Sequence, residues 1–155
     1  MINPRFLIPR LLRDTRGTML IETAIVAPVL VLMSLGAFQV STMVARQSEL
    51  QSAAAEASAI ALAATPDTDA KRATLKSIIM TSSGLPSNKV TVAAARRCGT
   101  NSTFTNGNTC GTGQKVSTYV RINLTDTYTP AWTSFGLGSP INYNVTRYVM
   151  LKQEA

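Results

Sequence analysis

The longest apolar run in the chain extends from Met19 to Val40 and contains a single ionisable residue, Glu22. As a helix rising about 1.5 Å per residue, a run of this length covers roughly 33 Å, which is enough to cross a bilayer. Pro28 removes one backbone donor inside the run and is expected to kink or loosen the helix, a change that membrane helices tolerate. The pattern therefore predicts one transmembrane segment.

The charges on either side of this run predict its orientation. Residues 1–17 contain four arginines and one aspartate, a net +3 within the chain total of +7. By the positive-inside rule these residues stay in the cytoplasm and the C-terminal part is exported. We therefore divide the chain into a basic leader (1–17), a transmembrane segment (18–40) and an exported domain (41–155).

Two other interpretations of the apolar run remain open. A cleaved secretory signal peptide is usually shorter, and small-residue sites such as Ala53–Ala55 lie too far beyond the run to serve it. The other interpretation is an ordinary uncleaved signal anchor, in which Glu22 has no role.

The helical pattern continues past the apolar run. Residues 41–64 contain no Gly or Pro, and one face of this stretch carries the small and apolar residues Met43, Leu50, Ala54, Ala57 and Ala61. Pro66 is expected to end this helix. A second helix is predicted over Asp67–Ser83, with Asp67 or Thr68 as its cap and Gly84 and Pro86 closing it.

The hydrophobic period then changes from helical to alternating. Alternation predicts strands over Lys89–Ala95, over Val116–Leu124, and from Ile141 to Leu151 with a bulge. Three such strands suit a small antiparallel sheet with one face covered by the exported helices. The predicted fold class is α+β.

Two polar loops hold the remaining notable residues. Cys98 and Cys110 in an exported domain most simply form a disulfide; their separation and the lack of further ligands argue against a redox or metal pair. The loop Thr129–Pro140 contains Trp132, the only tryptophan, with Phe135 and Leu137 close to it. We favour core filling over the sheet for these three, and the alternative is an apolar patch that faces a partner.

Composition excludes most enzymatic chemistry. The chain has no histidine, so neither a Ser-His-Asp triad nor a typical zinc site is available. We find no phosphate-binding or dinucleotide-binding glycine motif and no long Lys/Arg run. We therefore expect a protein that is not an enzyme, needs no cofactor and binds no nucleic acid.

The start of the apolar run supports a more specific interpretation. A Gly followed by four residues and a Glu, here Gly17 and Glu22, resembles the processing site of type IV prepilins. The longer string from Arg16 to Pro28 is similar to the TadE group of the tight-adherence (Tad/Flp) pilus systems, although Thr23 stands where an aromatic residue usually follows the Glu. Thr18 stands where type IV pilins commonly have Phe or Met. The resemblance implies cleavage between Gly17 and Thr18 by a prepilin peptidase, so that Glu22 becomes the fifth residue of the mature chain. It also implies that the carboxylate of Glu22 takes part in the assembly of subunits.

The same resemblance implies a function and a location. The chain would be a minor pseudopilin of the bacterial inner membrane with a periplasmic domain and a structural role in assembling a Flp/Tad pilus for adhesion and biofilm formation. Its partners would be other pilins, pseudopilins and inner-membrane pilus assembly proteins. Two alternatives are a type II secretion pseudopilin and a signal-anchored periplasmic binding protein whose ligand lies under the Trp132 loop.

Overall fold

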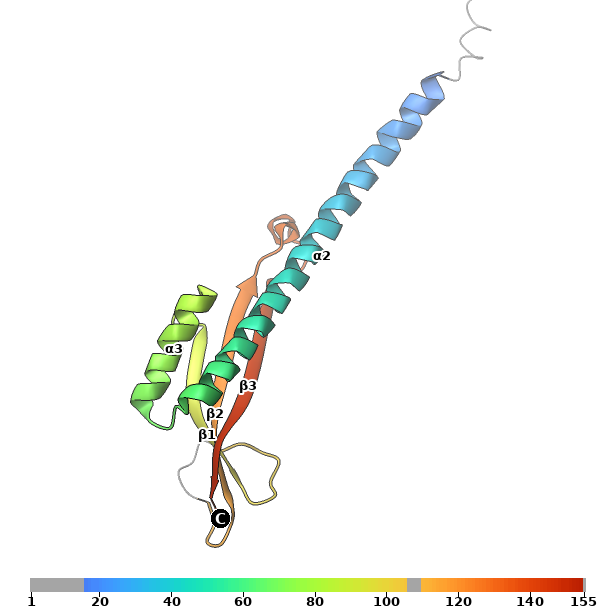
Figure 1. The fold of residues 1–155 in the computed structure, drawn as a ribbon. Helices are drawn as coiled ribbons and strands as arrows, with labels where there is room; N and C mark the ends of the chain where they lie inside the picture. The colour runs from blue at the N-terminus through green and yellow to red at the C-terminus, as the bar shows by residue number, and fades with distance from the viewer. Residues whose placement is uncertain (1–15, 106–109, 155) are drawn as a thin grey trace, which may run out of the picture. The chain divides into compact units, whose positions relative to one another are not determined.

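The computed structural model describes residues 16–105 and 110–154, so most of the predicted leader lies outside the described residues. The described elements are α2 (Arg16–Ala64), α3 (Asp69–Ser83), β1 (Val90–Cys98), β2 (Val116–Tyr128), η2 (Ala131–Phe135) and β3 (Ile141–Glu154). They form two units, which meet inside α2 between Thr42 and Met43. The predicted α+β class is confirmed (Figure 1).

Helix α2 continues from the apolar run into the second unit without interruption, with Pro28 inside it. It ends at Ala64, where the amide of Thr65 still donates to the carbonyl of Ala61 (3.0 Å). The next residue, Pro66, has no amide hydrogen to continue the helix, as the sequence predicted.

Helix α3 begins two residues later than predicted because Thr68, rather than Asp67, is its N-cap. The Thr68 side chain accepts a hydrogen bond from the amide of Lys71. At the other end, Gly84 adopts a left-handed conformation (φ 66°) and donates to the carbonyl of Met80. Glycine suits this position because it has no Cβ to clash at positive φ.

The three strands form an antiparallel sheet in the order β1-β2-β3 (Figure 1). All three strands run further than the apolar alternation predicted, since backbone pairing continues through polar residues such as Asp126. The predicted bulge is present in β3: Thr118 pairs with Lys152 and Tyr119 with Met150, which leaves Leu151 as the extra residue.

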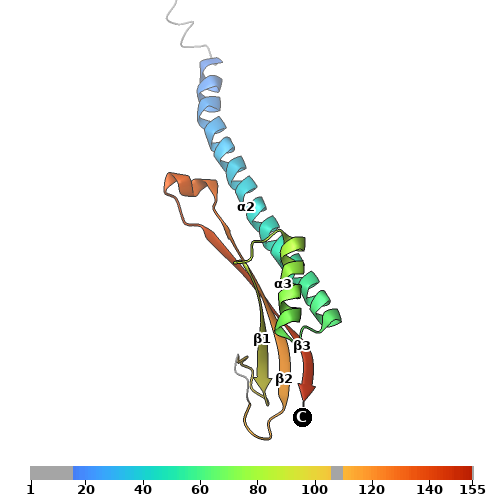
Figure 2. The same cartoon turned by 90° about the vertical axis from the view of Figure 1, so that its left-hand side faces the viewer.

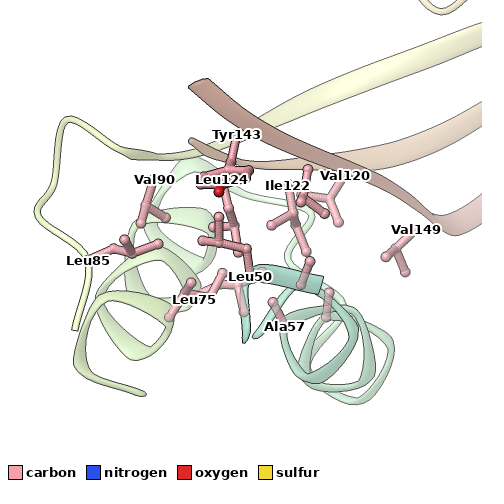
Figure 3. Packing of buried hydrophobic residues seen from close by; sticks show 14 residues of the cluster. Leu50, Ala57, Leu75, Leu85, Val90, Val120, Ile122, Leu124, Tyr143 and Val149 are labelled. Carbon is pink, nitrogen blue, oxygen red and sulfur yellow. The ribbon is translucent and has the colours of Figure 1, made fainter. Parts of the chain in front are cut away.

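The core of the second unit lies between the sheet and two helices on one of its faces (Figures 2 and 3). Residues 43–64 of α2 contribute mainly alanines, and Ala54, Ala57 and Ala61 are almost completely buried. Small side chains allow the helix backbone to approach the sheet closely. The large buried side chains come from α3 and the strands and include Leu75, Ile79, Val90, Val120, Ile122 and Leu124.

The opposite face of the sheet carries an aromatic cluster and lies beside the disulfide loop. The rings of Phe104 and Tyr148 stack at 3.8 Å, and Tyr119 meets Phe104 edge-on at 5.0 Å. Cys98, the last residue of β1, is joined to Cys110 with a Cα–Cα distance of 5.6 Å. The disulfide pairing expected from the sequence is present in the structure.

The alanine face of α2 predicts a position-dependent response to added volume. Ala57→Leu should lower the free energy of unfolding by about 1–3 kcal/mol, because the extra methylenes have no space against the sheet. Ala59→Leu, at an exposed position of the same helix, is the matched control and should change it little. Denaturant unfolding of the two variants checks this, and equal effects would contradict the packing described.

Candidate functional site

The first part of α2 exposes apolar side chains on every side. Leu20, Ile25, Leu32 and Phe38 each expose more than half of their surface. A helix that is apolar all round is stable only when something other than water surrounds it. By length and composition, α2 is the one described helix suited to crossing a membrane, which is consistent with a membrane anchor.

Two hydroxyl groups in this part of the helix have partners within the helix itself. Thr23 donates to the carbonyl of Met19 and Ser34 donates to the carbonyl of Leu30, each at 2.8 Å. Such bonds from residue i to i−4 supply the partner that lipid does not offer. These two polar side chains therefore present little obstacle to an apolar environment.

Glu22 is different because its carboxylate has no such partner. It is exposed, and no described residue donates to it or pairs with it. It lies on a helix face that carries a shallow groove. The groove is lined by Met19, Glu22, Thr23, Val26, Ala27 and Leu30. A charge in apolar surroundings is costly without a partner, so this face is where a cation from elsewhere would be stabilising.

The predicted scissile bond lies at the beginning of the same helix. Gly17 and Thr18 belong to the first turn of α2, which starts at Arg16. Glu22 follows Thr18 by four residues, which is about one helical turn. The structure thus brings Thr18 and Glu22 to neighbouring turns of one helix.

A cluster of charged side chains lies in the second unit, and no local sequence pattern predicts it. Asp126 is 7% exposed at its side chain and accepts a hydrogen bond from Arg46 Nε at 2.6 Å. The ammonium of Lys89 donates to its other oxygen. Arg46 also pairs with Glu49 at 2.6 Å. The cluster ties α2 to the start of β1 and the end of β2.

The charge state of Asp126 follows from these contacts. Burial raises the pKa of its carboxyl, but the hydrogen bonds from Lys89 and Arg46 outweigh burial and hold the pKa below its usual value. The backbone of Lys89 is held in place because its carbonyl oxygen accepts a hydrogen bond from the amide of Thr125 (N to O, 2.9 Å). Asp126 is therefore an ionised group that stabilises the fold.

The Trp132 loop does not fill the core, so the interpretation favoured from the sequence is wrong. Phe135 is 79% exposed and Leu137 is 64% exposed, while Trp132 is half-buried. The sheet face that needs cover is already occupied by α2 and α3. The alternative, an outward-facing apolar patch, agrees with these exposures.

Comparison with known protein families gives a match over the segment that contains Glu22. The family model described as "TadE-like protein" matches residues 17–59. No curated protein and no solved structure matches the chain. The resemblance to TadE-like proteins is thus confirmed over the apolar run and the helix that continues from it, which links this segment to Tad pilus systems.

The Asp126 cluster predicts a specific loss of stability in acid. Because the folded-state pKa of Asp126 is lowered, its contribution is present above the unfolded value of about 3.9 and is lost as the pH falls through the folded value. Asp126→Asn should lower the free energy of unfolding by about 1–3 kcal/mol at neutral pH.

The test is to measure unfolding of both proteins from pH 7 down to the acid range. The two free energies should converge as Asp126 protonates in the unsubstituted protein. A difference that stays constant over the whole range would show that the ionised carboxylate is not responsible.

Proposed function

We propose that this chain is a membrane-anchored minor pseudopilin of the TadE type with a structural role in assembling a Flp/Tad pilus for adhesion and biofilm formation. One observation carries the proposal. The TadE-like match at residues 17–59 includes the apolar run of α2, whose apolar side chains are exposed and whose single carboxylate, Glu22, has no described partner. The role is structural rather than enzymatic and requires no cofactor.

The charge distribution supports a particular topology. Residues 1–17 form a cytoplasmic leader, residues 18–40 cross the bacterial inner membrane, and residues 41–155 form a periplasmic pilin-like domain. The arginines of the leader favour the cytoplasmic side. The Cys98–Cys110 disulfide suits an oxidising compartment such as the periplasm.

Processing in this proposal uses the local backbone at Gly17. The first amides of a helix have no intrahelical acceptor, and glycine unwinds at little steric cost. A prepilin peptidase at the cytoplasmic face therefore meets a segment that is readily extended. Cleavage after Gly17 leaves Thr18 with a free, positively charged amine at the start of the apolar helix.

This amine and Glu22 supply each other's missing partner. Each charge alone is poorly solvated at the membrane boundary, and pairing removes that cost. The pair forms within one chain or between the carboxylate of an incoming subunit and the amine of its neighbour. In the second case the groove on the Glu22 face receives the apolar helix of another pilin or pseudopilin, and inner-membrane assembly proteins hold the subunits together.

Cleavage is tested by adding volume at the residue before the scissile bond. Gly17→Val should leave the full-length precursor in the membrane, because the side chain blocks access to the peptidase. Gly36→Val is the matched control: it lies in the same helix, and a Cβ there meets nothing within 4 Å. Mass spectrometry of the N-terminus in cells with an active Tad system distinguishes the two, and an intact Met1 in the unsubstituted protein would refute cleavage.

Removal of the carboxylate separates assembly from insertion. Glu22→Ala should still be cleaved and inserted, since the segment becomes more apolar, but the cells should lack surface pili. Glu56→Ala removes another exposed carboxylate of α2, beyond the apolar run, and should assemble normally. The measurement is a count of surface pili by electron microscopy; unchanged piliation with Glu22→Ala would exclude an assembly role for this residue.

A further inference from the structure

The hairpin that joins β2 to β3 has an unusual surface. From Thr127 to Thr146, 20 consecutive residues carry no charge. The most exposed large side chains of this stretch are Phe135 and Leu137, at 79% and 64%. An uncharged, protruding apolar loop is unfavourable in water and suits a surface that offers lipid.

The loop is also held in a fixed form. Its backbone is bonded internally: the amide of Thr133 donates to Pro130, that of Gly136 to Thr133 and that of Leu137 to Trp132. The indole of Trp132 lies against Gly138, where a Cβ would come within 3.4 Å of Nε1. Because these three amides are already hydrogen-bonded within the loop, moving them from water into a less polar environment leaves none of them without a partner.

Contacts within the second unit show which end of that unit carries the loop. The hydroxyl of Tyr143 donates to the carbonyl of Met43 at 3.2 Å, and Arg46 pairs with Asp126. Met43 is the residue at which the chain enters this unit from the apolar run. The end of β2 and the start of β3 are therefore at the entry end, while α2 runs away from it toward Ala64.

Two short stretches of chain separate the loop from the end of the apolar run. Val40, the end of the apolar run, precedes Met43 by three residues, or about 4.5 Å of helix. Beyond the Asp126–Tyr143 pair the hairpin continues for two more pairs, about 7 Å, before the loop starts. The covalent connection thus limits how far Phe135 and Leu137 can lie from the end of the apolar run.

We propose that residues 129–140 form a second membrane contact, in which Phe135 and Leu137 enter the lipid interface and Trp132 lies at the level of the headgroups. Tryptophan is typical of this level because its ring is apolar and its N–H is polar. The inference rests on the membrane anchoring in the proposed function, but not on cleavage or on a role in a pilus.

A lipid surface explains this stretch better than a protein partner does. Protein interfaces usually combine an apolar centre with a polar rim whose charges select the partner. Here the uncharged stretch extends through both strand ends, so no charge close to Phe135 in the sequence is available for such selection. Phe135 and Leu137 would fix the height and rotation of the exported domain above the membrane.

Fluorescence of Trp132, the single tryptophan, tests this insertion in the full chain. The protein is reconstituted into phosphatidylcholine–phosphatidylglycerol vesicles with and without brominated acyl chains. We expect the emission to be blue-shifted and quenched by the brominated lipid. The double variant Phe135→Ser/Leu137→Ser should lose most of the quenching while it still floats with the vesicles.

The double variant Leu62→Ser/Ile78→Ser removes two exposed apolar residues of the same unit and is the matched control that should keep the quenching. Floating protein with unquenched, water-like emission, or equal quenching in both double variants, would overturn loop insertion alone. Protein that does not float at all would overturn the anchoring as well. In cells, a photo-crosslinker at position 135 should yield lipid adducts, and adducts with a protein instead would assign the loop to a protein partner.

Discussion

The fold depends on one helix being covered in two different ways along its length. In residues 43–64 of α2, alanines face the sheet and the core closes around them. In residues 19–40 no part of the described chain covers the apolar side chains, which are exposed all round. The described residues do not bury this apolar surface, and in the proposed function lipid and the apolar helices of other subunits bury it.

Asp126 and Glu22 differ in whether the described chain provides a cation for the carboxylate. Asp126 is buried beside two cations of its own chain and stays ionised, so it stabilises the second unit. Glu22 has no described partner of its own. In the proposed function its partner is the amine freed at Thr18, either of the same chain or of a neighbouring subunit.

The helices and the three strands were predictable because their signals are local. Thr68, Gly84 and Pro66 act on their own backbone neighbours, and alternation in β2 reports which side chains face inward. Asp126 continues the inward phase of Val120, Ile122 and Leu124, so a buried carboxylate was implied there. Its partners were not, because Arg46 and Lys89 are 80 and 37 residues away in the sequence.

The Trp132 loop was misjudged for a related reason. Apolar composition indicates that Phe135 and Leu137 avoid water, but not which surface covers them. The core volume over the sheet is filled by α2 and α3, a fact that depends on long-range packing. The proposed pairing of Glu22 lies beyond sequence patterns altogether, because it requires cleavage after Gly17 and, in its intermolecular form, a second molecule.

Photo-crosslinking from the groove face of α2 tests whether this helix packs against another subunit. A crosslinker at Val26, which shares the groove with Glu22, should give adducts with pilin-type subunits in cells that carry an active Tad system, and lipid adducts in cells that lack it. Lipid adducts alone in both kinds of cell would show that α2 is a membrane anchor that takes no part in assembly.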